Sequence, residues 1–147
     1  MNAAYREGLY FDGDIDIPII DWRPYLEEVL DMHNSHQSFA ARQRIIDHMG
    51  HHDNQLIWFT DARPGTPRAD HTMEAFAVLH EWITNIRANP SAGVGANRPA
   101  SAVDRCWATD GTLIAEGAGV WAGVLPIGSA PRAGCYSSWS STRAAPQ

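Results

Sequence analysis

Lysine is absent from this sequence: its 11 basic residues are all arginine, and 17 acidic residues bring the formal net charge to −6. Binding to nucleic acid requires a basic surface, so this balance argues against a nucleic-acid partner. No apolar run approaches the roughly 20 residues that span a bilayer, which argues against a membrane segment. The first residues, Met-Asn-Ala-Ala-Tyr-Arg-Glu, also lack the apolar stretch of a signal peptide.

Cysteine is scarce, with only Cys106 and Cys135 in 147 residues. They do not form a Cys-x-x-Cys motif, which excludes a zinc ribbon and a thioredoxin-type site. Either the two cysteines form a disulfide, which implies an oxidising compartment, or they are two free thiols. Spacing does not decide between these alternatives.

A third absence concerns catalysis. Serine hydrolases of the α/β type carry their nucleophile on a Gly-x-Ser-x-Gly turn between a strand and a helix, and no such turn occurs in the sequence. Ser35, Ser38 and the other local serines do not sit in a strand–turn–helix with flanking glycines, the geometry that exposes the hydroxyl. If the chain has hydrolase ancestry, we expect it to be a truncated or split protein that is inactive alone.

The residues that are present predict an α/β fold. Apolar stretches at 15–22 and 55–60 are typical of buried strands, and a capped amphipathic pattern predicts a helix over 38–49. Strand, helix and strand at this spacing indicate a βαβ unit with parallel strands. Two further helices are expected, a short one at 23–30, with a proline in its first turn, and a longer one at 72–87. In the longer helix, spacings of three and four predict a buried stripe of Met73, Phe76, Leu79, Ile83 and Ile86.

The sequence changes character near Pro90, beyond which eight of the twelve glycines lie. Within this Gly-rich and Pro-rich irregular segment, Asp110-Gly111 between β-compatible runs predicts a type I′ hairpin over 106–115. We therefore divide the chain into a lead-in (1–14), a partial α/β-hydrolase-like domain (15–89), the irregular segment (90–136) and a mobile tail (137–147).

Candidate catalytic residues follow the two predicted strands. Because groups that follow parallel strands gather at the carboxyl edge of a sheet, Asp31 and His71 are expected to lie close together. His71 precedes a helix, whose dipole favours the neutral ring that accepts a proton, so we interpret it as a base. Asp31 is the orienting acid and Asp21, at a strand end, is the alternative acid. The opposing interpretation is that both are solvated loop or capping residues.

Metal and cofactor sites are not predicted. Asp31, His33 and His36 lie close together in sequence, and so do His48, His51, His52 and Asp53. Neither group has the His-Glu-x-x-His spacing that places two ligands and a base on one helical face. The second group also enters the second strand at its amino end, away from Asp31.

Several separated strings resemble a known family; they are Ile17-Pro18-Ile19-Ile20-Asp21-Trp22-Arg23-Pro24-Tyr25-Leu26, Leu30-Asp31-Met32-His33, Gln37-Ser38-Phe39, Asn54-Gln55-Leu56-Ile57-Trp58 and Gly93-Val94-Gly95-Ala96-Asn97-Arg98-Pro99. Over roughly residues 8–125 they resemble the C-terminal region of an uncharacterised bacterial domain-of-unknown-function family. Its members look like secreted α/β-hydrolases of the tannase and feruloyl esterase type.

The resemblance implies that residues 15–89 form the closing part of a hydrolase sheet, with Asp31 as the acid and His71 as the base. It also implies a secreted protein, a small-molecule ester substrate and a partner chain or upstream segment that carries the nucleophile. The alternative is a non-catalytic α/β remnant or a small binding domain. In either case we expect low stability, because an apolar strand edge at 17–22 would lack its neighbour.

Overall fold

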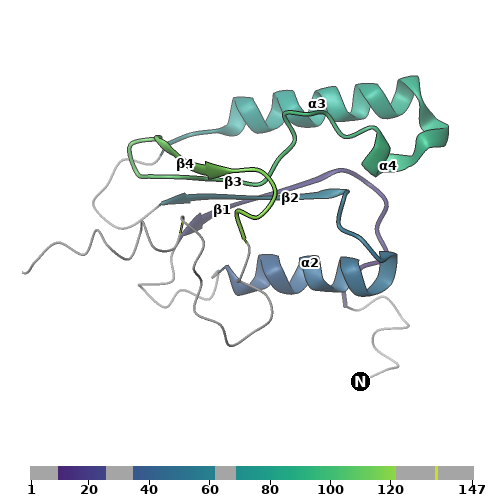
Figure 1. The fold of residues 1–147 in the computed structure, drawn as a ribbon, viewed down its shortest axis with the longest axis horizontal. Coiled ribbons are helices and arrows are strands. Elements are labelled where there is room, and N and C mark those ends of the chain that lie inside the picture. Colours follow the sequence, from purple (N-terminus) through teal and green to yellow (C-terminus); the bar gives the residue numbers. More distant parts are fainter. Residues whose placement is uncertain (1–9, 26–34, 62–68, 122–134, 136–147) are drawn as a thin grey trace, which may run out of the picture.

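A computed structural model describes residues 10–25, 35–61, 69–121 and 135. Its described part is an α/β fold in which a four-stranded sheet lies between helices, with α2 (His36–Met49) on one face and α3 (Thr72–Ala88) on the other (Figure 1). The strands are β1 (Ile19–Tyr25), β2 (Gln55–Asp61), β3 (Arg105–Trp107) and β4 (Leu113–Glu116), in that spatial order. A short 3₁₀ turn, η2 (Pro90–Ala92), and the helical turn α4 (Gly93–Ala96) follow α3.

The predicted βαβ unit is confirmed. β1 and β2 pair in parallel along their whole lengths, from Ile19 opposite Gln55 to Tyr25 opposite Asp61, and α2 connects them. Gly50 ends α2 at a φ of 80°, a left-handed conformation that favours glycine, and its N–H donates to the Ile46 carbonyl at 2.8 Å.

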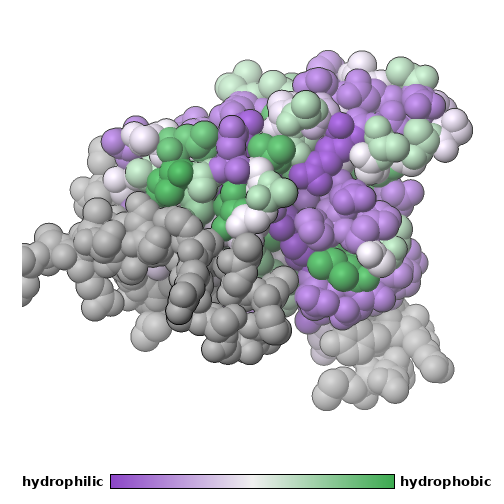
Figure 2. Space-filling view, in the orientation of Figure 1, coloured by the Kyte–Doolittle hydropathy of each residue, from purple (hydrophilic) through white to green (hydrophobic). Residues whose placement is uncertain are grey.

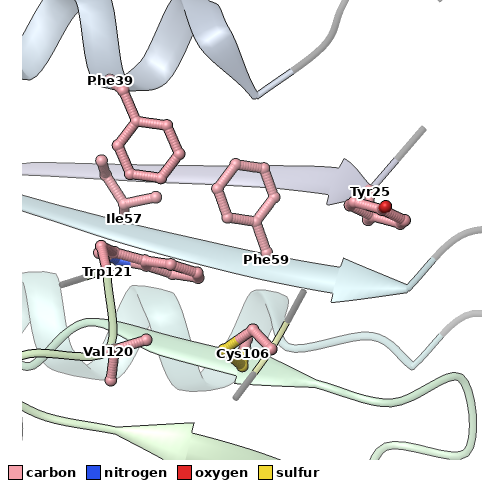
Figure 3. Packing of buried hydrophobic residues seen from close by; sticks show 8 residues of the cluster. Tyr25, Phe39, Ile57, Phe59, Cys106, Val120 and Trp121 are labelled. Atoms are coloured by element: carbon pink, nitrogen blue, oxygen red, sulfur yellow. A yellow bond between two sulfur atoms is a disulfide. The ribbon is translucent and has the colours of Figure 1, made fainter. Parts of the chain in front are cut away.

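β2 is the centre of the core, since all seven of its residues are buried. Its side chains alternate between the two faces, as the pleat of a strand requires. Ile57 and Phe59 pack on the α2 side with a cluster that includes Phe39 and Trp121 (Figure 3). Leu56 and Trp58 pack on the other side against α3; the buried members of this second cluster are Leu56, Trp58, Val78, Trp82, Val94, Ala102 and Trp107.

The helix predicted from residue 23 is wrong at its start, because β1 continues through Arg23 and Pro24 to Tyr25. Tyr25 is 6% exposed and belongs to the α2-side cluster, so extended backbone buries a large side chain here. Pro24 is compatible with a strand that has a neighbour on only one side among the described strands. Residues 26–30 of that prediction lie outside the described residues.

The helix predicted at 72–87 forms, but its buried face differs from the predicted stripe. Met73 is 77% exposed and Phe76 is 66% exposed, whereas Val78 and Trp82 are buried against the sheet. Two apolar stripes run along α3, and the wide indole of Trp82 lies on the inner one, where its Nε1–H donates to the Val94 carbonyl at 2.9 Å. Figure 2 shows apolar side chains scattered among polar ones on the visible surface of the molecule.

The hairpin also forms, with β3 and β4 antiparallel, but its connection is longer than a two-residue type I′ loop. Trp107 pairs with Leu113, which leaves residues 108–112 as the loop, and the Gly111 N–H donates to the Ala108 carbonyl at 3.0 Å. β3 also pairs in parallel with β2. The Gly-rich segment therefore contributes two strands to the same sheet as the βαβ unit.

Candidate functional site

The carboxyl ends of β1 and β2 lie at one edge of the sheet, and α3 begins near that edge (Figure 1). His71 is the residue before α3, so the fold brings it to the edge that the sequence predicts. Asp31, its predicted partner, lies outside the described residues. His51 and His52 precede β2 and therefore lie at the opposite edge, as expected.

The start of α3 is held by a local hydrogen bond. Asp70 Oδ1 accepts from the Thr72 backbone N–H at 2.9 Å, and the Ala75 N–H donates to the His71 carbonyl at 2.9 Å. Hydrogen bonds from the Thr72 side chain and then from its backbone lower the pKa of Asp70 below its ordinary value. Because His71 lies between these groups, its backbone position is fixed by the first turn of the helix.

The His71 ring lies in an aromatic setting. It stacks on Trp107 with ring centroids 4.0 Å apart and planes 23° apart, and the Trp22 ring approaches it edge-on at 6.2 Å. Trp22 is itself fixed by a hydrogen bond from its Nε1–H to Thr60 Oγ1 at 2.8 Å. These contacts restrict rotation of the imidazole, and its side chain is only 14% exposed.

Among the described residues, the carboxylate in contact with His71 is Glu74, whose Oε2 lies 3.2 Å from Nδ1. Glu74 also pairs with Arg105, which in turn bonds Glu116 with 3.0 Å between Nε and Oε2. A carboxylate at Nδ1 favours the tautomer with the proton on that nitrogen, which leaves the Nε2 lone pair to accept a proton. His71 Nε2 is buried and has no hydrogen-bond partner in the described part of the chain.

Sequence reasoning did not select Glu74. The usable signal is its spacing, because residues three apart in the first turn of a helix lie side by side. Sequence reasoning also missed Asp61, the last residue of β2, which is 1% exposed at the same edge. The positions of both carboxylates are set by the end of β2, for Asp61, and by the start of α3, for Glu74.

The alternative acid, Asp21, lies elsewhere. It is the third residue of β1, two positions before Arg23, and the two side chains form an ion pair of 2.9 Å between Oδ1 and Nε. Trp22 packs against the α3-side cluster, so its neighbour Asp21 points to the α2 face. The structure therefore does not bring Asp21 and His71 together.

Of the groups that lie close together in sequence, Asp31 and His33 fall outside the described residues, and the described histidines and carboxylates do not converge on one point. His48 faces Asp14, with 3.5 Å between Nε2 and Oδ1, and His51 faces Asp53, with 3.8 Å between Nδ1 and Oδ2. Over the described ranges, no three His, Cys, Asp or Glu side chains gather as a metal site would require. Nor does any described helix combine the length and apolar character needed to cross a membrane.

Residues 1–143 match the tannase-like family of unknown function (DUF6351). The chain belongs to this family. The match covers nearly the whole sequence and confirms the resemblance found over residues 8–125. No curated protein and no solved structure matches the chain.

Membership of the tannase-like family indicates hydrolase ancestry. It does so independently of the geometry, which places a histidine with an adjacent carboxylate at the carboxyl edge of a mostly parallel sheet. This is the edge at which α/β folds gather their functional groups.

Proposed function

We propose that this chain carries the acid and base of an ester hydrolase, with His71 as the general base. The observation that carries the proposal is the difference between the surroundings of the two ring nitrogens. Nδ1 lies 3.2 Å from the Glu74 carboxylate, and Nε2 is buried without a hydrogen-bond partner among the described residues. A buried polar atom left unpaired costs about 1–3 kcal/mol, so the site favours a hydroxyl that donates to Nε2.

The reaction we propose is acyl transfer through a serine. Nε2 of His71 removes the proton from the serine hydroxyl as its oxygen attacks the ester carbonyl, and the protonated ring then gives that proton to the leaving alcohol. A carboxylate at Nδ1 holds the tautomer and stabilises the imidazolium. Water then releases the acid from the acyl-enzyme by the same route.

Two carboxylates are proposed for the position at Nδ1. The order of elements selects Asp31, which lies outside the described residues, and the contact distance selects Glu74. Glu74 is shared with Arg105, which fixes the carboxylate but also draws part of its charge away from His71. Asp31→Asn and Glu74→Gln separate the two assignments when their turnover is compared in the co-expressed preparation described below.

The nucleophile is proposed to come from outside this sequence, which contains no Gly-x-Ser-x-Gly turn. A serine with its oxyanion donors supplies most of the rate in such enzymes, so we expect no turnover of nitrophenyl esters by this chain alone. Turnover that survives dialysis and is blocked by a serine-directed inhibitor would contradict this expectation. We further propose a secreted protein, because Cys106 and Cys135 form a disulfide and disulfides persist in oxidising compartments.

The proposal is tested by co-expressing the chain with the protein segment encoded immediately upstream and measuring nitrophenyl acetate hydrolysis. We expect activity that falls at least about 100-fold in His71→Gln. His80→Gln is the matched control, because His80 is an exposed histidine on the same helix. An upstream region without a Gly-x-Ser-x-Gly turn, or equal activity in the two variants, would favour the alternative of a non-catalytic α/β domain.

A further inference from the structure

A cavity of about 500 Å³ opens at the opposite edge of the sheet from His71. Its lining residues include His52 and Asp53 before β2, Val103 and Asp104 before β3, and Ala118 after β4. Since β2 has seven residues at about 3.3 Å each, roughly 20 Å separate this cavity from the carboxyl edge. It is therefore not part of the proposed hydrolytic site.

Arg98 is the cation of this cavity. Its Nε donates to the Ala102 carbonyl at 2.6 Å and its Nη1 to the Asp53 carbonyl at 3.3 Å, so backbone oxygens hold the guanidinium in place. The guanidinium also lies over the Trp82 ring, 5.7 Å from its centroid. Across the described residues Arg98 forms no ion pair, and its Nη2 makes no hydrogen bond.

The other charges at this cavity are already balanced or solvated. Asp104 is held by both terminal nitrogens of Arg42, at 2.6 and 2.8 Å, so its charge is neutralised within the protein. The Asp53 side chain is 63% exposed, where water screens its carboxylate. The positive charge of Arg98 is thus the one that remains available to a ligand.

His52 adds a second polar group. Its Nδ1 is buried and has no hydrogen-bond partner among the described residues. Burial, followed by the positive charge of Arg42, lowers the pKa of His52 below its ordinary value, so the ring is neutral near pH 7. A neutral imidazole offers one donor and one acceptor, which suits a ligand with hydrogen-bonding oxygens.

The rest of the wall is small and apolar, with Pro99, Ala100, Ala102, Val103 and Ala118 among the lining residues. Gly95 contributes to this shape, since a Cβ there would lie 2.8 Å from the Asp53 Cβ. A cavity of this volume, with apolar walls and few fixed polar groups, has the properties of small-molecule sites.

We propose that this cavity binds a small organic carboxylate, whose anionic end pairs with Arg98 and whose apolar part lies against the alanine and proline wall. An arginine fixed by backbone carbonyls is suited to this role because its planar fork matches a carboxylate. The ligand occupies a site distinct from His71, so the proposal stands whether or not the chain acts as a hydrolase.

The test is an NMR titration of the full chain with benzoate, read at the amide signals of Gly95 and Gly117. Benzyl alcohol, which has the same ring without the charge, is the comparison ligand. We expect saturable shifts with benzoate, and binding at least about tenfold weaker for benzyl alcohol and for Arg98→Gln.

Because Arg98 also supports the backbone, a second variant blocks the cavity without touching the guanidinium. Ala118→Phe places a ring at an exposed position of the lining and should weaken benzoate binding about tenfold or more. The matched control is Ala88→Phe, at an exposed position outside the cavity, which should leave binding unchanged. The proposal is overturned if benzoate does not bind, if benzyl alcohol binds equally well, or if Ala118→Phe binds benzoate like the original chain.

Discussion

Arg42 is a charged residue buried in the described core. Its guanidinium is 5% exposed and pairs with Asp104, while its Nε donates to Gln55 Oε1 at 3.0 Å. Asp104 Oδ1 also accepts the backbone N–H of Ile57 at 2.8 Å. The pair therefore joins α2, the interior of β2 and the segment before β3. These hydrogen bonds align the three elements more precisely than hydrophobic contacts alone would.

Removing one partner of this buried pair should be strongly destabilising. Arg42→Gln leaves the Asp104 carboxylate largely buried without its counter-charge, and we expect the free energy of unfolding to fall by about 3–5 kcal/mol. Urea denaturation followed by tryptophan fluorescence measures this change. Arg44→Gln is the control, because Arg44 is an exposed neighbour on the same helix, and it should shift the free energy by less than about 0.5 kcal/mol. Equal effects of the two substitutions would show that the ion pair does not hold the fold.

At the scale of the element, α3 shows why periodicity alone did not identify the buried face. The helix carries apolar residues on more than one side, and the choice between them depends on which side chains fit the sheet. Trp82 is fully buried between the sheet and α4, whereas Phe76 is 66% exposed. The size of the Trp82 side chain and a partner for its indole N–H decide which face of α3 packs on the sheet. Neither is visible in the spacing of apolar residues.

Paired truncations test this orientation. Trp82→Ala should lower the free energy of unfolding by about 3–5 kcal/mol through loss of buried area and the cavity left behind. Phe76→Ala, which removes an aromatic ring from an exposed position of the same helix, should change it by less than about 0.5 kcal/mol. The two values come from thermal or urea unfolding of the full chain. A larger loss for Phe76→Ala would instead support the stripe that the sequence predicts.

The elements themselves were largely predictable. Gly50 after Met49 marks the end of α2, the buried run 55–60 marks β2, and Asp110-Gly111 marks the hairpin, because each rests on local chemistry. Predictions failed where tertiary contacts override local preference. Tyr25 extends β1 because it fills the core, and β3 joins β2 through contacts that no local pattern encodes.

The candidate site was predicted in part. His71 lies at the expected edge because the order of strand, helix and strand fixes it there. Its contact with Glu74 also depends on the rotamers of the two side chains and on the ion pair between Glu74 and Arg105. Spacing along the helix makes this contact possible but does not predict that it forms.

At the scale of the whole molecule, a disulfide between Cys106 and Cys135 ties β3 to a residue 29 positions further along the chain. Both cysteines are fully buried in the α2-side cluster (Figure 3). The link lies within the Gly-rich segment and fixes two of its residues in the core that the βαβ unit builds.

We expect the unreduced protein, unfolded in denaturant, to show no thiol that reacts with a chromogenic disulfide reagent, and to show two after reduction. Closing a loop of this length stabilises a fold by about 3–4 kcal/mol in the chain-entropy account. The double variant Cys106→Ala and Cys135→Ala should lower the free energy of unfolding by a similar amount. Two reactive thiols in the unreduced chain would instead support the alternative of free cysteines.

The outer side of β1 is the last feature with a consequence for the whole molecule. β1 pairs only with β2 among the described strands, and most of its residues are only partly buried. An unprotected strand edge pairs readily with other chains, and natural proteins often protect such edges with lysine, a residue this sequence lacks.

We therefore expect the isolated chain to associate as its concentration rises, as measured by sedimentation velocity over about a 100-fold range. Ile17→Lys should reduce this association, because Ile17 is 57% exposed just ahead of the strand. Leu113→Lys is the control for net charge, since it adds the same charge at an exposed position of β4. A monomer across the whole range would contradict the prediction, and equal effects of the two lysines would assign the association to net charge instead of to the edge of β1.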